Sequence, residues 1–259
     1  MLGLHKLMVL HLTGEREQRD THKLYEGPII EQMPVLRNEG RVVVPTWYVM
    51  DRFLRAPDDV QKIWRKNDFY TSDAFAHTQA GEGKVIVDCA DLEQALTLEN
   101  RARFNGEGGL VLPSTADFEN LSGSNVLNIS SGRIDDVHSR SGQNFHLGCY
   151  QREPSGKIVP SNDLVEEIWH FLARGRVNVD EYAKAVGDLI HLPKFMYLHL
   201  NISRASQLPV VKPLVLAGVK APSGTVSKLT LPYIYYGDPL NSVDYFNVVG
   251  VLPSTLKQN

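Results

Sequence analysis

The stretch Ser122–Lys157 reads SGSNVLNISSGRIDDVHSRSGQNFHLGCYQREPSGK, and it stands between two parts of the chain that look like ordinary folded protein. It is dense in glycine, serine and asparagine, and its apolar runs are short. This composition is typical of a long polar loop or hairpin at a protein surface. Long loops are more often functional than short ones, so this stretch is the first place to look for a site.

The sequence before this stretch predicts alternating strands and helices. Residues 84–87 form a short apolar run typical of a strand, and Asp91 with Gln94 has the spacing of a capping box at the start of a helix. Residues 108–113 form a second short apolar run. Strand, helix and strand in this order favour a βαβ unit of about 30 residues.

The sequence directly after the polar stretch predicts two helices joined by a short turn. Ser161 or Asn162 is placed to cap the start of the first helix and Asn178 the start of the second, and Asn178 has Glu181 three positions on. Arg174 followed by Gly175 predicts the end of the first helix. Two helices with so short a connection should pack as a hairpin.

The last third of the chain reads as β structure. Residues 194–204 alternate as a strand, and from Leu208 onward short apolar runs alternate with proline, glycine, serine and asparagine. The fold class that we predict is α+β, with a mixed sheet, a central long polar loop or hairpin and a β-rich C-terminal third. We expect an α/β-like lobe at 1–121, the polar segment at 122–160, and a helical hairpin followed by β structure at 161–259. The alternative is that all three form one domain.

The composition is that of a globular protein, with 42% hydrophobic and 22% charged residues among 259. A net charge of -3 argues against a broad nucleic-acid-binding face but leaves a local basic groove open. The two cysteines, Cys89 and Cys149, are too few for a disulfide framework, and a reducing, cytoplasmic location is the default expectation. No apolar run is long enough to predict a membrane span.

Two predicted strands carry similar triplets, His11-Leu12-Thr13 and His199-Leu200-Asn201. In each, the histidine and the polar residue two positions on share one face of the strand. Facing histidines could act as general acid and base on a phosphodiester, while Thr13 and Asn201 bind phosphate oxygens. The triplets resemble the paired H-x-T/S motifs of two-histidine phosphoesterases, although Asn201 stands where that family has serine or threonine. The alternative, which we favour, is that both histidines have only local roles on their strands.

Carboxylates and imidazoles are closely spaced in the central stretch, and together they could hold a divalent metal for hydrolysis. The candidate metal ligands are Asp135 and Asp136. The candidate catalytic residues of the stretch are Asp135, His138 and His146, and the candidate substrate-binding residues are Arg133 and Arg140. The alternative is a surface loop that is rich in charge because water solvates it.

Two further residue sets have chemical alternatives that we do not favour. Glu82 and Lys84, with Asp73 upstream, have the residue types of a metal-dependent nuclease core, but Glu82 reads as a turn residue. Aromatic and basic residues also recur between Trp47 and Tyr70, and such residues can bind single-stranded nucleic acid by stacking and phosphate contact. Buried aromatic side chains with arginines on the opposite face explain the second set equally well.

The sequence leaves two functional hypotheses of different classes. The first is a hydrolase acting on phosphodiesters or nucleic acid, with a divalent metal as the cofactor that its carboxylates would suit. The second is a non-catalytic binding protein or subunit of a larger complex, with a protein or nucleic-acid partner or further copies of itself. It is motivated by the apolar, proline-punctuated β region at the end of the chain. No phosphate-binding glycine loop, zinc-protease helix or hydrolase nucleophile motif is present to choose between them.

Overall fold

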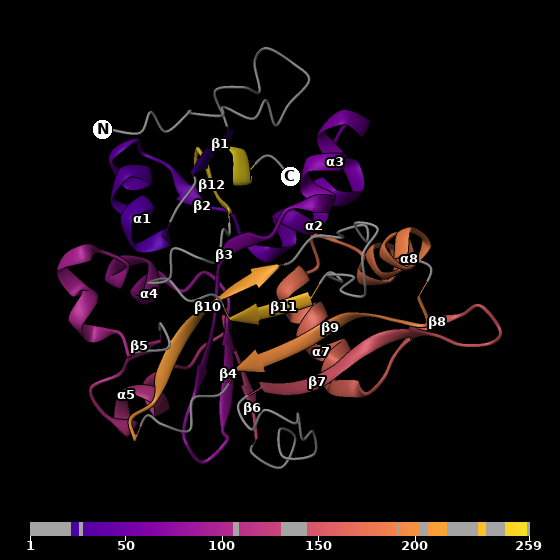
Figure 1. The fold of residues 1–259 in the computed structure, drawn as a ribbon. Helices are drawn as coiled ribbons and strands as arrows, with labels where there is room; N and C mark the ends of the chain where they lie inside the picture. The colour runs from indigo at the N-terminus through magenta and orange to yellow at the C-terminus, as the bar shows by residue number, and fades with distance from the viewer. Residues whose placement is uncertain are drawn as a thin grey trace, which may run out of the picture.

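A computed structural model describes residues 22–25, 28–105, 109–130, 144–190, 192–201, 207–216, 233–236 and 247–257. Within these residues a single mixed sheet of 12 strands runs through the molecule, and its main path has the order β1-β12-β3-β10-β11-β9-β7-β8. Figure 1 shows the sheet with helices on both sides. The strands are β1 (His22–Tyr25), β2 (Val42–Val43), β3 (Phe69–His77), β4 (Gly83–Ile86), β5 (Leu110–Val111), β6 (Val126–Ile129), β7 (Asn144–Arg152), β8 (Ile158–Pro160), β9 (Lys194–Asn201), β10 (Val210–Leu216), β11 (Tyr233–Tyr236) and β12 (Asn247–Val251).

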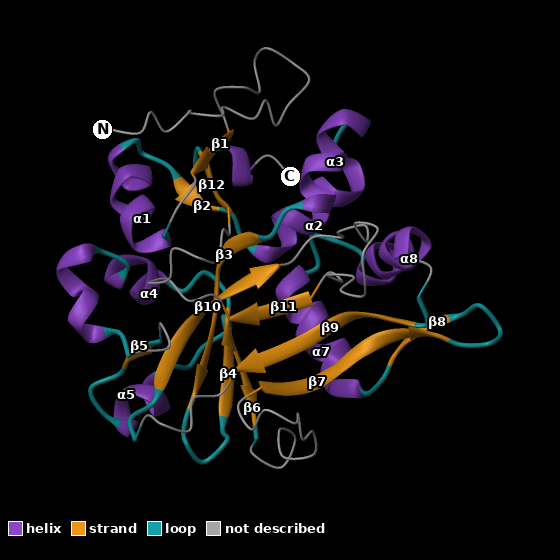
Figure 2. Ribbon diagram, in the orientation of Figure 1, coloured by secondary structure: helices purple, strands orange, loops and turns teal. Residues whose placement is uncertain are grey.

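Helices cover both faces of this sheet, as Figure 2 shows by secondary structure. They are α1 (Ile29–Asn38), α2 (Thr46–Arg55), α3 (Asp58–Lys66), α4 (Ala90–Ala95), α5 (Thr115–Asn120), α7 (Asp163–Ala173) and α8 (Val179–Ile190), with the 3-10 turns η2 (Leu98–Arg103) and η3 (Thr255–Lys257). β3 is parallel to β12 and β9 is parallel to β11, while the other described strand pairs are antiparallel. The predicted α+β class with a mixed sheet is therefore confirmed.

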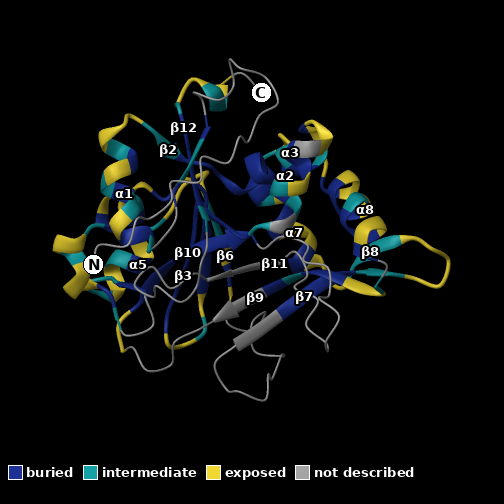
Figure 3. Cartoon of the chain, turned by 45° about the horizontal axis from the view of Figure 1, so that its top comes forward, coloured by how far each residue is buried: buried dark blue, intermediate teal, exposed yellow. Residues whose placement is uncertain are grey.

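Two hydrophobic cores lie on opposite faces of the sheet because side chains alternate along each strand. On β3, Phe75 packs into the core beneath α2, α3, α7 and α8. Its neighbours Ala74 and Ala76 pack into the core beneath α1, α4 and α5. Figure 3 shows the central strands as the buried layer between the two groups of helices. Strands from all three predicted segments join this sheet, and the segment boundaries themselves stay a prediction.

The two predicted helices after the polar stretch are confirmed together with their ends. The side chain of Asn162 caps α7 by accepting a hydrogen bond from the Val165 amide at 3.0 Å. Arg174 ends α7 in the left-handed conformation at φ 53°. The side chain of Asn178 accepts hydrogen bonds from the amides of Asp180 and Glu181 at the start of α8. These helices were predictable because their caps are local in sequence.

The predicted βαβ unit is wrong. Its two strands exist as β4 and β5, but β5 pairs with β10, whereas β4 pairs with β3 and β6. The first residues of β10, Val210 and Val211, pair with both β3 and β5. A local pattern specifies an element but not its neighbour, and here the strand next to β5 comes from about 100 residues later in the chain.

Simple alternation along the strand at 194–201 also fails. Phe195 and Met196 are consecutive, yet both are fully buried in the same core. Met196 has a φ of 51°, and the register with β7 shifts between Gly148 and Tyr150. A bulge of this kind rotates the chain locally, so two successive side chains reach one face.

Candidate functional site

Most of the residues nominated from the sequence lie outside the described part of the chain, so their roles stay predictions. They are His11, Thr13, Arg133, Asp135, Asp136, His138 and Arg140. The remaining three, His146, His199 and Asn201, lie on β7 and β9, where the structure describes the backbone. The predicted metal ligands are thus not tested. Among described residues no group of three or more His, Cys, Asp or Glu side chains is arranged to hold a metal ion.

The backbone register brings together residues that the sequence treated as separate sets. β7 and β9 are antiparallel neighbours, and His146 is the register partner of His199. Asn144, the first residue of β7, is the partner of Asn201, the last residue of β9. His146 was nominated with the central stretch and His199 with the histidine triplets. The strand pairing that joins them has no signal in the local sequence, which is why sequence reasoning kept them apart.

These paired residues lie at one end of the sheet, which we call the His77 end. His77, the last residue of β3, pairs with Gly83 of β4 and with Val210 of β10, and Gly83 pairs with Ile129 of β6. β9 runs parallel to β11 and therefore antiparallel to β10, so β9 ends where β10 begins. The strand ends that define the His77 end are His77, Gly83, Ile129, Asn144, Asn201 and Val210. The chain thus leaves β6 and enters β7 at this end, on either side of residues 131–143.

A cluster of charged groups fastens α7 to the sheet, and we call it the Arg174 cluster. Nη2 of Arg174 lies 2.6 Å from Oδ1 of the fully buried Asp73, and Nη1 of Arg174 pairs with the carboxylate of Asp88. Asp73 also accepts hydrogen bonds from the amide of Thr46 at 2.8 Å and from the amide of Asp88 at 3.1 Å. The hydroxyl of Ser72 donates to Asp88 at 2.9 Å. The cluster therefore joins α2, β3, the chain after β4 and the end of α7.

The electrostatics of this cluster follow from burial. Desolvation raises the pKa of Asp73 above its ordinary value, and the charge of Arg174 with the hydrogen bonds of Thr46 and Asp88 only partly offsets it. Burial also raises the pKa of the nearby Glu93 to about 7, and the charge of Asp88 adds to this effect. Asp88 and Arg174 both have a φ of 53°, a conformation that costs a residue with a side chain about 1 kcal/mol or more.

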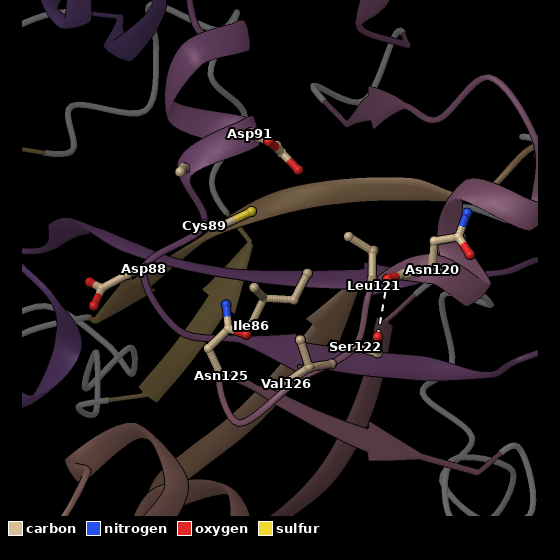
Figure 4. A pocket seen from close by; sticks show the side chains of 10 residues that line it. Ile86, Asp88, Cys89, Asp91, Asn120, Leu121, Ser122, Asn125 and Val126 are labelled. Carbon is tan, nitrogen blue, oxygen red and sulfur yellow. Dashed lines mark hydrogen bonds between the residues drawn. The ribbon is translucent and has the colours of Figure 1, made fainter.

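A pocket of about 240 Å³ lies beside Asp88, between the start of α4 and the loop before β6 (Figure 4). Asp88, Asp91, Asn120, Ser122 and Asn125 contribute polar groups to its lining. The remaining lining residues are Ile86, Cys89, Ala90, Leu121 and Val126. Burial raises the pKa of the Cys89 thiol to about 12, so the thiol is protonated at neutral pH and is a poor nucleophile.

The nuclease-like set is not assembled. Lys84 pairs in register with Ala76, so its side chain projects to the α5 face of the sheet, where its Nζ donates to the carbonyls of Phe118, Glu119 and Leu121. Asp73 is used on the opposite face by Arg174. Lys84 thus stabilises the C-terminal end of α5, where a cation is favoured by the helix dipole.

The aromatic residues between Trp47 and Tyr70 do not form a surface on which nucleic-acid bases could stack. The aromatic side chains of that set are buried: Trp47, Tyr48, Trp64 and Tyr70. Two of the basic residues lie over buried rings, Arg52 over Tyr48 and Arg65 over Phe53. The alternative of buried aromatic side chains is confirmed, but the arginines expected on the opposite face are not all there, because Arg52 and Arg65 lie over buried rings. In the described part of the chain no helix is long and apolar enough to cross a membrane.

Comparison with known proteins identifies the fold. No family model and no curated protein matches the sequence. One similar solved structure, with a TM-score of 0.52 and 12% sequence identity, covers 89% of this chain and 97% of its own chain. The description of that structure concerns the accommodation of massive sequence variation in Nanoarchaeota by the C-type lectin fold. At this identity the likeness shows the fold alone, and the present chain has a C-type lectin-like fold.

Proposed function

We propose that this chain is a non-catalytic binding protein that recognises a protein partner at the His77 end of its sheet. The observation that carries the proposal is the register, which gathers at that end the strand ends of three successive pairs, β3 with β4, β6 with β7, and β9 with β10. Loops between strand ends on a rigid scaffold are the usual place for recognition in proteins. The polar segment 131–143 is attached there, between Ile129 and Asn144.

The roles of the charged residues in the described part of the chain support this proposal. Two sets of charged contacts serve the scaffold, because Arg174 is paired with Asp73 and Lys84 donates to three carbonyls at the C-terminal end of α5. A scaffold held by such buried contacts can keep its shape while residues at the His77 end change. The similar solved structure is described in terms of sequence variation within this fold. By analogy, we infer that the His77 end of the present chain carries the residues that choose the partner.

The hydrolase hypothesis stays a second candidate because one observation favours it. His146 and His199 are register partners. Residues opposite each other on neighbouring strands are close enough for one histidine to serve as general acid and the other as general base on a phosphodiester. The two candidates make opposite predictions for the same pair of residues. A binding protein uses them for contact with its partner, whereas a hydrolase loses turnover when they are replaced.

The experiment that tests the proposal begins with the partner captured from an extract of the source organism, identified by mass spectrometry and then purified. Its affinity for the purified chain is measured by calorimetry. His146→Ala with His199→Ala should weaken binding by about tenfold or more, which corresponds to about 1.4 kcal/mol. Lys62→Ala, on the exposed side of α3, is the control and should leave the affinity unchanged.

The same three proteins are then assayed on phosphodiester substrates with and without divalent metal. The proposal predicts no turnover above buffer for any of them. Turnover by the natural chain that disappears in the histidine double variant but survives in Lys62→Ala would establish the hydrolase instead. Equal loss of affinity in the double variant and in Lys62→Ala would place the recognition surface elsewhere.

A further inference from the structure

Two Asn-x-Ser sequences flank the short strand β6. Asn120-Leu121-Ser122 begins at the last residue of α5, and Asn128-Ile129-Ser130 lies at the end of β6 and just beyond it. Asn-x-Ser is the acceptor sequence for N-linked glycosylation when x is not proline. The motif alone has little specificity, so its meaning depends on where the fold places the asparagine and serine side chains.

The fold leaves all four polar residues of these motifs in solvent. The asparagine and serine of both motifs are exposed, whereas Ile129, between Asn128 and Ser130, is buried with only 1% of its surface exposed. Alternation along β6 therefore directs Asn128 and Ser130 away from the core that holds Ile129. In the first motif, the Ser122 hydroxyl donates to the carbonyl of Asn120 at 3.3 Å, the dashed line in Figure 4.

The two acceptor asparagines also differ from asparagines that serve the scaffold. Asn162 and Asn178 cap helices with their side chains, and Asn105 accepts from the amide of Gly109 at 2.8 Å. Among described residues, the side-chain amides of Asn120 and Asn128 make no hydrogen bond within the protein. Attaching a bulky group to either amide therefore breaks no side-chain hydrogen bond among the described residues.

We propose that Asn120 and Asn128 are acceptor sites for N-linked oligosaccharide. The donor is an oligosaccharide joined through phosphate to a lipid. The amide nitrogen of each asparagine forms a bond to the anomeric carbon of the first sugar, and the bond from that carbon to the phosphate oxygen breaks. The lipid phosphate leaves with the electron pair, and the nitrogen loses one proton to a base of the transferase. No oxidant or reductant is needed.

The position of β6 gives such glycans a physical role. Among described strands β6 pairs with β4 alone, so within the described part of the chain its other side is an edge of the sheet. Exposed strand edges can pair with other chains, and proteins cover or block them. Asn120 lies before the loop that leads into β6, and Asn128 lies near the end of β6. Bulky hydrophilic groups on both residues would shield that edge.

This inference does not rest on the proposed binding function. It does bear on location, because the transfer takes place outside the cytoplasm, whereas the two cysteines alone favour a cytoplasmic chain. A glycan on the natural protein would therefore decide against the cytoplasmic expectation. The pair Asn120 and Asn128 has an internal control in Asn125, which is exposed in the same loop but is followed by Val126 and Leu127.

The test is peptide mapping by mass spectrometry of the full chain purified from its source organism. Peptides with Asn120 and Asn128 should carry hexose-containing mass additions, and enzymatic release of the glycan should leave aspartate, heavier by about 1 Da. Ser122→Ala and Ser130→Ala, expressed in the same organism, should each lose one glycan, and Ser130→Thr should keep it. Unmodified peptides at both sites would overturn the inference. So would equal modification of Asn125, because transfer would then not be directed by the motif.

Discussion

Arg174 at the end of α7 places its Nη2 2.6 Å from Oδ1 of Asp73 in the middle of β3, and the two residues are 101 positions apart in the chain. Asp73 is fully buried, while Arg174 keeps contact with solvent. Because Asp88 pairs with the second guanidinium nitrogen, one arginine joins the end of α7 to β3 and to the chain just after β4. This contact fixes the scaffold on which the proposed recognition surface stands.

Removing Arg174 should be one of the most damaging single changes to stability. Arg174→Ala leaves the buried Asp73 carboxylate without its cation, and breaking a buried pair from one side costs about 3–5 kcal/mol. The matched control is Arg152→Ala, which removes the partner of Asp188 in a solvent-exposed pair and should lower the stability far less than Arg174→Ala. Urea unfolding followed by circular dichroism measures both. Similar losses for the two variants would show that the Asp73 pair is not special.

Glu93 should make the protein less stable as the pH rises. Its pKa in the folded chain is about 7, raised above the ordinary value of 4.5 chiefly by burial. Between these two values the unfolded chain has already lost the proton that the folded chain still holds, so the free energy of unfolding falls as the pH rises.

Replacement of Glu93 with glutamine checks this coupling. The melting temperature of Glu93→Gln relative to the natural chain should increase from pH 4.5 to about pH 7 and then level off. Glu99→Gln, at an exposed position on η2, is the control and should show no such trend. A constant difference between Glu93→Gln and the natural chain across this range would mean that the carboxyl titrates normally.

Gly148 and Gly156 separate the cost of a clash from the cost of backbone strain. Both have positive φ, at 143° and 85°, so alanine at either position costs about 1–3 kcal/mol for the backbone alone. A Cβ at Gly148 would also lie 2.5 Å from Oγ of Ser161 and from Cγ2 of Val165, whereas at Gly156 nothing lies within 4 Å. Overpacking adds about 1–3 kcal/mol. Gly148→Ala should therefore lower the urea midpoint clearly more than Gly156→Ala, and the reverse order would contradict the packing of β7 against α7.

Cys89 should be unreactive in the folded protein. Its side chain is buried, and its pKa of about 12 leaves almost no thiolate at pH 8. Incubation with iodoacetamide at this pH should leave Cys89 unmodified for hours in buffer and modify it within minutes in urea. Rapid alkylation in buffer, measured by mass spectrometry, would show that the pocket beside it opens in solution.

Parts of the fold that depend on neighbouring residues were predictable from the sequence. The caps of α7 and α8 at Asn162 and Asn178 follow from residues within one helical turn, and so does the end of α7 at Arg174. The partner of Arg174 was not predictable, because Asp73 has no local feature that distinguishes a buried ion pair from a catalytic carboxylate. Asp73 was instead grouped with Lys84, although the pleat of the sheet sends the two side chains to opposite faces.

The candidate site was predictable to a smaller degree. The sequence nominated His146 and His199 for separate reasons, and only the antiparallel register of β7 and β9 relates them. Register depends on which strands pair, and this is set by turns, bulges and packing far along the chain. The break at Met196 shows the same limit, because no alternation pattern contains the extra residue that rotates β9.

The most direct test of recognition at the His77 end is site-specific photo-crosslinking to the purified partner. A photoreactive residue is placed at Asn144, where β7 begins, or at Lys62 on α3 as the control. We predict a crosslinked product from position 144 that unlabelled natural chain competes away, and none from position 62. Efficient crosslinking from position 62 with none from position 144 would contradict recognition at this end of the sheet.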